Sequence, residues 1–268
     1  MGGIPLLAPW ANRLDHAGFW ADGKEFDLHK DLGNLKLDSN GLPIHGLLWK
    51  QAWEVIEVTS DETSASMTSR FDFSKHPELM AQWPFAHTYE MTYRLADGVL
   101  ETKITVTNHS AETMPLSLGF HPYVGIPDVP RDQWKATIPA RLRVVTDPRL
   151  IPTGEYGPMN LPSPLPLAGV TLDDGFAGLV RDATGLATFS IEADGRKVEV
   201  VFGPKYEVAI VWVPVRPNGE VPNFVCFEPM TGVTNAINLH HAGKYPSLQM
   251  IPPGRQWSES FWIRASRI

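Results

Sequence analysis

Residues 100–108 read Leu-Glu-Thr-Lys-Ile-Thr-Val-Thr-Asn, and their alternation decides the fold class. The even-numbered side chains from Leu100 to Val106 are apolar or β-branched, whereas the odd-numbered ones from Glu101 to Thr107 are polar or charged. A period of two places these two sets on opposite faces of a β-strand. The stretch therefore predicts a strand in a sheet that has one buried face and one wetter face.

The same period recurs along most of the chain after residue 50. Turn sequences such as Asp97-Gly98 and Asp194-Gly195 separate several of the segments. The best helical signal covers residues 75–82, where Pro77 suits a first helical turn. The chain is therefore predicted to be all-β, a large sandwich of many mostly antiparallel strands with few short helices. Further strands are predicted at 53–59, 64–73, 88–95, 114–120, 142–146, 188–192, 197–202, 208–213, 224–228 and 259–264.

Length and composition favour one large folding unit. The chain has 268 residues, 43% of them hydrophobic, which is enough apolar material for a sizeable core. No repeat and no shift in composition divides it, so we expect a single domain over residues 1–268. The run 157–166 holds four prolines and is predicted to be a long loop within that domain.

Charge and cysteine content exclude several classes of partner. Thirty Asp and Glu outnumber 23 Lys and Arg, and no basic run is present, so we expect no nucleic-acid partner. The single cysteine, Cys226, cannot form an internal disulfide. No apolar run approaches the length of a membrane span, and the start lacks the basic region of a signal peptide, so no membrane association and a cytoplasmic location are expected.

Four short stretches place ionisable side chains beside proline, glycine and aromatic residues. Arg13 follows Asn12, and its guanidinium offers a fork of donors to a hydroxylated ligand or forms a surface ion pair. His45 lies among apolar neighbours, which suits either a core or turn histidine or a site residue. His121 precedes a proline that favours an extended backbone and tends to end strand pairing, so its ring is well placed to face a cleft.

Glu228 is the fourth candidate. Phe224, Cys226 and Glu228 share one face of a predicted strand, so the carboxylate ends an otherwise apolar row. A carboxylate in such a place either emerges into solvent or is buried with a raised pKa. A buried carboxylate of this kind is suited to act as a general base.

The remaining candidates are weaker. Asp173-Asp174-Gly175 is interpreted first as a turn, and the adjacent His240 and His241 would diverge on a strand without any metal-binding motif beside them. No Gly-rich nucleotide motif and no serine-hydrolase elbow occur. Among nine tryptophans, Trp49 is our candidate for stacking on a sugar.

The four stretches together, in this order and spacing, resemble the signature of the aldose 1-epimerase (galactose mutarotase) family. A turn at 248–254 resembles a late Leu-x-Pro-Gly element of the same family, so the resemblance spans nearly the whole chain. It implies a galactose-mutarotase-like β-supersandwich, in agreement with the predicted strands. The matching stretches are Pro9-Trp10-Ala11-Asn12-Arg13, His45-Gly46 with Trp49, Gly119-Phe120-His121-Pro122-Tyr123 and Phe227-Glu228-Pro229-Met230-Thr231.

The resemblance also implies roles for individual residues. His121 would be the general acid that protonates the pyranose ring oxygen, and Glu228 the general base that takes the proton of the C1 hydroxyl. The substrate would be bound by Asn12, Arg13, His45 and an aspartate of an Asp-x-x-Phe pattern, which matches Asp173 with Asp174 as the alternative. An isomerase of this kind opens the hemiacetal ring by proton transfers alone, without a metal ion or an organic cofactor.

The resemblance has two departures. Several strands usually precede the Asn-Arg motif in the family, whereas here the motif stands at residues 12–13. A sheet without its usual N-terminal strands would expose edges, so we expect a homodimer or an open edge. The segment from His45 to Trp49 has no basic residue for a phosphate, which favours a neutral free aldohexose over a hexose 6-phosphate.

Two other functions compete with the epimerase. A non-catalytic carbohydrate-binding module on the same fold would need Arg13 and the aromatic residues but not the pair His121 and Glu228. A glycosidase or polysaccharide lyase is less favoured, because glycosidases usually need two carboxylates and the sequence offers one compelling candidate.

Overall fold

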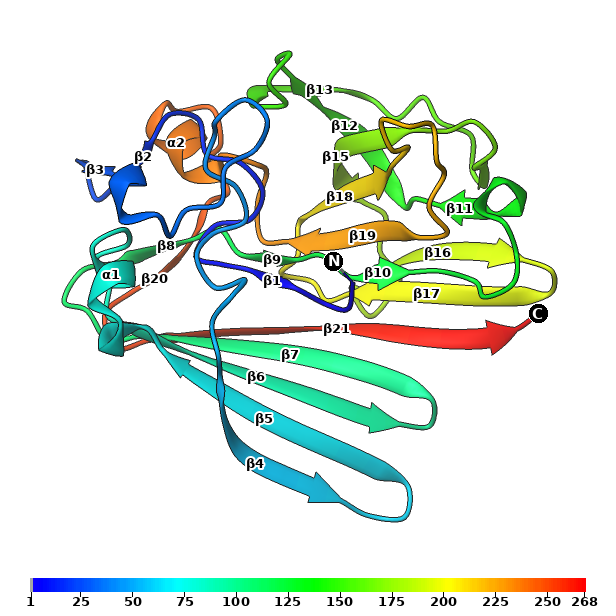
Figure 1. Cartoon of the computed structure of the whole chain (residues 1–268), viewed down its shortest axis with the longest axis horizontal. Helices are drawn as coiled ribbons and strands as arrows, with labels where there is room; N and C mark the ends of the chain where they lie inside the picture. Colours follow the sequence, from blue (N-terminus) through cyan, green and yellow to red (C-terminus); the bar gives the residue numbers. More distant parts are fainter. Residues whose placement is uncertain (1) are drawn as a thin grey trace.

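The computed structural model describes residues 2–268, and most of the strand residues lie in two antiparallel sheets (Figure 1). The eight-stranded sheet has the order β1 (Leu6–Leu7), β9 (Gly119–Phe120), β19 (Val225–Met230), β18 (Val208–Val213), β15 (Leu172–Leu179), β12 (Ala140–Thr146), β13 (Pro152–Pro158), with β10 (Tyr123–Val124) also paired with β19. The nine-stranded sheet has the order β14 (Leu165–Pro166), β11 (Lys135–Thr137), β16 (Ala187–Ala193), β17 (Arg196–Phe202), β21 (Gln256–Arg267), β7 (Val99–Asn108), β6 (His87–Ala96), β5 (Ser64–Asp72), β4 (Glu54–Ser60).

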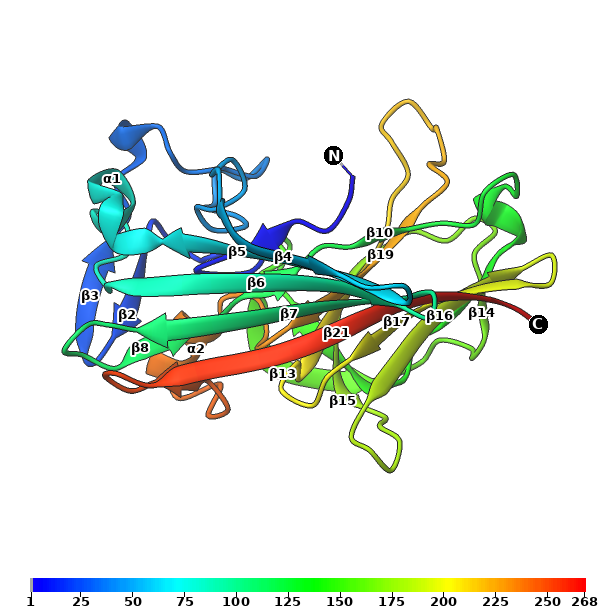
Figure 2. The same cartoon turned by 90° about the horizontal axis from the view of Figure 1, so that it is seen from below.

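The smaller elements lie mainly at one end of the sheets (Figures 1 and 2). None of the helices in residues 2–268 is long and apolar enough to cross a membrane. The two ribbons are β2 (Gly18–Ala21) with β3 (Lys24–Asp27) and β8 (Met114–Leu116) with β20 (Gln249–Ile251), the α-helices are α1 (Pro77–Met80) and α2 (Ala236–His241), and the 3-10 turns are η1 (Lys30–Leu32), η2 (Phe73–Lys75) and η3 (Arg131–Gln133).

The two sheets pack face to face through aromatic side chains. Phe227 of β19 lies with its ring centroid 5.5 Å from that of Phe189 in β16, and Phe120 of β9 lies 4.9 Å from Phe261 in β21. All four rings are buried. Because side chains alternate along a strand, the neighbours of Phe227 point to the opposite, outer face of the eight-stranded sheet. Glu228 lies on that outer face for this reason.

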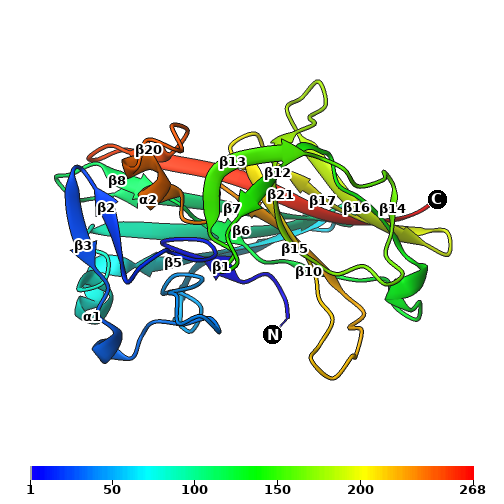
Figure 3. The same cartoon turned by 90° about the horizontal axis from the view of Figure 1, so that it is seen from above.

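The strand predicted at 100–108 is confirmed as β7, where Thr102, Ile104 and Val106 are buried and Lys103 is exposed. It pairs with β6 on one side and β21 on the other, and these long strands lie side by side in one layer (Figures 2 and 3). Apart from the segment 114–120, the other strands predicted from the period of two are also present, with bounds shifted by a few residues. The all-β class with mostly antiparallel strands is therefore confirmed.

Three local predictions are wrong. The single strand at 114–120 is two strands, β8 and β9, which pair with different partners. The long loop predicted at 157–166 overlaps the end of β13 and contains β14, so Pro158 and Pro166 occupy strand positions at sheet edges, where a missing N–H is tolerated. The Asp-Asp-Gly turn at 173–175 lies inside β15, because cross-strand pairing with β18 overrides the local turn preference.

Helices depart from the sequence expectation as well. The helical segment 75–82 is only α1, a single turn that begins at Pro77 after the 3-10 turn η2. His240 and His241 end the unpredicted helix α2. This helix begins after Asn235, a common N-cap residue whose side chain makes no cap hydrogen bond here, and it buries Ala236, Ile237 and Leu239, so tertiary packing stabilises it.

Candidate active site

Two neighbouring strands bring the predicted acid and base together on the outer face of the eight-stranded sheet. β19 carries Glu228, and its register pairs Met230 with Gly119 of β9 and Cys226 with Tyr123 of β10. His121 lies in the short break between β9 and β10, opposite Glu228. The distance from His121 Nε2 to Glu228 Oε1 is 3.2 Å. The sequence places these residues 107 positions apart, and the sheet register makes them adjacent.

The Glu228 carboxyl group is almost completely buried, with 2% of its side chain exposed. Burial raises the pKa of Glu228 well above its ordinary value, the nearby Asp173 carboxylate adds to this rise, and the cations of Arg13 and Lys36 oppose it. Within residues 2–268, Glu228 Oε2 receives no hydrogen bond from a protein group. The group is therefore a desolvated carboxylate with one oxygen available to a hydroxyl of a ligand, as a general base requires.

The pKa of the His121 imidazole is shifted in the opposite direction to that of Glu228. Burial lowers its pKa to about 4, and the Lys36 cation contributes to the lowering. Its ring stacks on Tyr123 at a centroid distance of 4.8 Å and meets Trp212 edge to face at 5.4 Å. The two rings fix the imidazole beside Glu228, so acid and base keep their relative placement without any ligand.

His45 faces the same pair from a different part of the chain. Its ring centroid is 5.6 Å from that of His121, and burial, with the Lys36 cation next, lowers its pKa to about 2. The residue adopts a left-handed backbone with φ of 65°, and its N–H donates to the carbonyl oxygen of Asn12. The neutral imidazole keeps both a donor and an acceptor nitrogen, which suits a bond to a sugar hydroxyl.

The glycine that follows His45 explains the His-Gly pair of the sequence. Gly46 has φ of 66° and pairs with Ala8, and a Cβ added to it would lie 2.0 Å from the Ala8 carbonyl oxygen. No other residue fits so close an approach of two backbones. Gly46 therefore determines where His45 enters the site.

Arg13 is held by carboxylates on two sides. Its Nε donates to Asp38 Oδ2 at 2.8 Å, and its Nη2 lies 3.6 Å from Asp173 Oδ2. The Asn12 side-chain oxygen accepts from the Arg13 N–H at 2.9 Å and from Arg13 Nη1 at 3.0 Å. Asn12 is itself buried, so in this structure it orients the guanidinium from behind.

The structure separates the two adjacent aspartates. Asp173 faces Arg13, and burial raises its pKa, partly offset by the Arg13 cation. Asp174, the next residue on β15, points to the other face and accepts from Arg143 at 2.6 Å and 3.0 Å. Because strand side chains alternate, only one of the two can reach the site, and that residue is Asp173.

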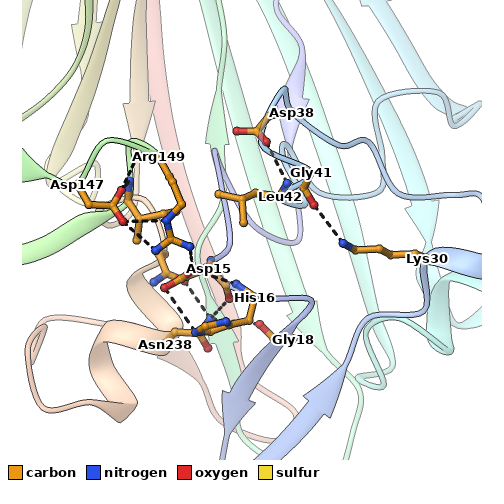
Figure 4. Close-up of polar contacts among 12 residues, drawn as sticks. Asp15, His16, Gly18, Lys30, Asp38, Gly41, Leu42, Asp147, Arg149 and Asn238 are labelled. Carbon is orange, nitrogen blue, oxygen red and sulfur yellow. Dashed lines mark hydrogen bonds and ion pairs between the residues drawn. The ribbon is translucent and has the colours of Figure 1, made fainter.

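Two loops frame this arrangement, and their contacts are drawn in Figure 4. In the loop that carries Asp38, its Oδ1 accepts from the N–H of Leu42 at 2.9 Å, and Lys30 Nζ donates to the Gly41 carbonyl at 3.1 Å. The contacts shape the loop that supplies the carboxylate partner of Arg13. On the other side, Arg149 donates to Asp15 and Asp147, and Asn238 donates to the Asp15 carbonyl.

Trp49 lies among cations. Lys50 Nζ is 4.1 Å from the centroid of its ring and Lys36 Nζ is 5.9 Å from it. The aromatic rings in contact with His121 are instead those of Tyr123 and Trp212. Stacking of a sugar on Trp49 stays a prediction.

Sequence reasoning missed Trp212 and Lys36. Trp212 lies in an apolar strand, and only its register opposite Asp173 and Cys226 places it beside His121. Lys36 belongs to a loop rich in polar residues, where a lysine is normally solvated, and no local signal distinguishes it. Within residues 2–268, no group of three or more His, Cys, Asp or Glu is arranged to hold a metal ion.

Comparison with known proteins agrees with this fold. The architecture is that of galactose mutarotase-like proteins: a crystal structure of one from Clostridium acetobutylicum superimposes with a TM-score of 0.86 at 22% identity, over 99% of this chain and 80% of that one. A family model described as aldose 1-epimerase matches residues 3–264, so the chain belongs to the aldose 1-epimerase family.

Similar proteins occur in Escherichia coli K12. The uncharacterized protein YphB is 24% identical over 277 residues, which cover 96% of this chain and 82% of that protein. A crystal structure of a putative aldose 1-epimerase from the same bacterium has a TM-score of 0.75 at 21% identity and covers 99% of this chain and 84% of that one.

Proposed function

We propose that this protein interconverts the α and β anomers of a free aldohexose by opening and reclosing the pyranose ring. The observation that carries the proposal is the contact of 3.2 Å between His121 Nε2 and Glu228 Oε1 in a buried site. The two oxygens that must exchange protons, O1 and O5, are bonded to the same carbon of the sugar. An acid and a base that lie side by side therefore fit the two atoms on which they act.

The proton transfers follow from this geometry. Glu228 takes the proton of the C1 hydroxyl while His121 protonates the ring oxygen, so the C1–O5 bond breaks and a C1 carbonyl forms. After rotation about C1–C2, O5 attacks the other face of the carbonyl carbon, His121 takes its proton back and Glu228 returns the proton to O1. Arg13, His45 and Asp173 hold the remaining hydroxyls during the rotation.

The buried carboxylate favours this enzyme over a carbohydrate-binding module on the same fold. A module gains nothing from a desolvated carboxylate that has no protein donor on one oxygen, whereas a base needs such a group. Burial raises the pKa of Glu228 and lowers that of His121, so both shifts favour the neutral pair over the ion pair. The productive state has the proton on His121.

The test is the rate of anomerisation of freshly dissolved α-D-glucose and α-D-galactose, followed by polarimetry. We expect the wild type to accelerate it and Glu228→Gln to lose roughly 10²- to 10⁴-fold of that acceleration, because proton transfer to the base is removed. Sugar binding should be largely retained in the variant. A Glu228→Gln protein that keeps full activity would remove Glu228 from the role of base, and a wild type that binds sugar without turnover would support the module.

A further inference from the structure

A hollow of about 340 Å³ lies at the end of the molecule where β2, α2, β8 and β20 gather (Figures 1 and 3). Its volume is in the range of small-molecule sites, about 300–1,000 Å³. Its walls come from the tip of the β2–β3 hairpin, the last residues of α2 and the facing residues of the β8–β20 ribbon. In the part of the chain that the structure describes, it shares no wall residue with the active site, so it is a separate cavity.

Trp20 in the wall of this hollow is not explained by the packing of the core. On β2, Phe19 is buried and stacks on Trp83 at a centroid distance of 4.3 Å, whereas Trp20 points to the other face and is half-buried. The ring stacked on Trp20 is the imidazole of the exposed His241, at 3.9 Å and an interplanar angle of 6°. A large apolar ring that is kept partly exposed beside a cavity is a feature of binding surfaces rather than of cores.

The Trp20–His241 stack is held in place without a ligand. The N–H of Trp20 donates to Asn238 Oδ1 at 3.2 Å, and Asn238 Nδ2 donates to the Gly18 carbonyl oxygen at 3.2 Å, so α2 is fixed on β2. His240 Nδ1 donates to the Tyr245 carbonyl oxygen at 2.9 Å, which leaves Nε2 as the acceptor of the neutral ring. The aromatic wall is therefore preorganised, which lowers the entropic cost of binding a ligand.

The other wall residues combine apolar groups with one formal charge. Asp22 lies in the turn between β2 and β3, where its φ of 49° and the φ of 70° at Gly23 make a tight connection that places it in the wall. Thr113 adds a hydroxyl group, and Leu248 and Met250 add an apolar side. Within residues 2–268, no Lys or Arg lines the hollow, so an anionic ligand would find no cationic partner there.

We infer from this arrangement that the hollow is a second carbohydrate site, which binds a neutral pyranose ring. A pyranose has C–H bonds on its faces and hydroxyl groups around its edge. It can therefore lie against the Trp20–His241 wall while its hydroxyls donate to the Asp22 carboxylate. Because this site lies apart from the acid and base of the active site, it binds the sugar without turnover. Its ligand needs no free anomeric hydroxyl, so glycosides bind as well as free sugars.

The test titrates the protein with methyl β-D-glucopyranoside, methyl β-D-galactopyranoside and methyl α-D-mannopyranoside, which cannot anomerise. In NMR spectra, the indole N–H signal of Trp20 and the methyl signal of Met250 report on this hollow. The indole N–H signal of Trp212 reports on the active site. For at least one glycoside we expect both signals of the hollow to shift along one binding curve with a millimolar Kd, the weak affinity typical of a single sugar ring.

Variants assign the binding to the wall residues. Trp20→Ala should weaken the binding that Met250 reports roughly tenfold, because the stacking surface is lost. Asp22→Asn should weaken it about three- to tenfold, because a charged acceptor is lost. Neither side chain belongs to the buried core, so both variants should fold. The matched control is Trp262→Ala, which removes a half-buried tryptophan of β21 outside the hollow and should leave the binding unchanged.

The outcomes separate this inference from the proposed function. Signals of Trp20 and Met250 that stay unshifted with all three glycosides overturn the second site, and so does a Trp20→Ala variant that keeps the Met250 binding curve. Shifts with tetramethylammonium but not with the glycosides overturn the saccharide as the ligand. Trp20→Ala should anomerise α-D-glucose at the rate of the wild type, so a failure of the epimerase and a failure of this site are seen independently. A loss of both activity and glycoside binding in this variant would place Trp20 in the active site and contradict a separate one.

Discussion

Two regions of the molecule depart from ordinary burial in opposite directions. The first is the outer face of β15, β18 and β19, which faces the site, and the second is the pair of outer strands β4 and β5. At the first, Glu228 and His121 are polar and buried. At the second, every residue of β4 is exposed, including Val55 and Val58, with 69% of Val58 accessible. A buried carboxylate costs stability and is kept where chemistry needs it. An exposed edge strand with apolar side chains lowers solubility, and it indicates a surface for association with another chain.

The largest expected effect concerns Gly46, which determines the position of His45 in the buried polar region. Gly46→Ala should destabilise the fold by about 3–4 kcal/mol, because it combines a left-handed residue with a collision with the Ala8 carbonyl. Gly98→Ala is the matched control, since Gly98 has a similar φ of 72° but nothing within 4 Å of an added Cβ, and should cost about 1 kcal/mol. Urea unfolding measures both. Equal decreases in the free energy of unfolding for the two variants would show that the close approach of Gly46 to Ala8 adds nothing to the cost of the substitution.

The two aspartates of β15 give the next prediction. Asp173→Asn should lower kcat/KM for the substrate roughly 10- to 100-fold, because a charged acceptor for sugar hydroxyls is lost next to Arg13. Asp174→Asn breaks an exposed ion pair with Arg143 and should leave kcat/KM nearly unchanged. The reverse result would place Asp174 in the site and contradict the register of β15.

A smaller effect is expected on folding stability, and it shows whether the buried Glu228 carboxylate destabilises the folded protein. Below the pKa of unfolded glutamate, about 4.3, both states hold the proton. As pH rises above that value the unfolded chain ionises first, so the wild type loses stability until the pH passes the raised pKa of folded Glu228. Glu228→Gln lacks this loss. It should unfold at a higher temperature than the wild type at pH 7 and at nearly the same temperature at pH 4, and a lower temperature at pH 7 would mean that the carboxylate stabilises the fold.

The smallest effect concerns the apolar region. We propose that the homodimer expected from the sequence forms at the free edge of β4, where a second copy can extend the nine-stranded sheet. Val58→Lys should then shift sedimentation toward the monomer with almost no change in the melting temperature of the fold, because the side chain is exposed. A wild type that sediments as a monodisperse monomer would contradict the dimer.

The sequence predicts the sheet content well because alternation is local. The strands from β4 to β7 and from β16 to β19 follow from it. Prediction from alternation fails where a partner strand decides the outcome, as at Asp173 in β15, or where tertiary burial stabilises a helix of only six residues, as in α2.

The candidate site shows the same limit. His121 and Glu228 are recognisable from the proline that follows each and from the row of apolar residues before Glu228. Their contact depends on the pairing of β9 and β10 with β19, which no single segment encodes. Trp212 and Lys36 carry no local signal, because a tryptophan in an apolar strand and a lysine in a polar loop are both ordinary.

The distribution of the site along the chain has a consequence for folding kinetics. The five site residues lie on segments that meet only when β15, β19 and the β9–β10 segment have assembled with the N-terminal part of the chain. They are Arg13, His45, His121, Asp173 and Glu228. Contacts between such distant positions require closure of long loops, which slows their formation. During refolding from denaturant, catalytic activity should therefore return later than the β-sheet signal of hairpins such as β6 with β7.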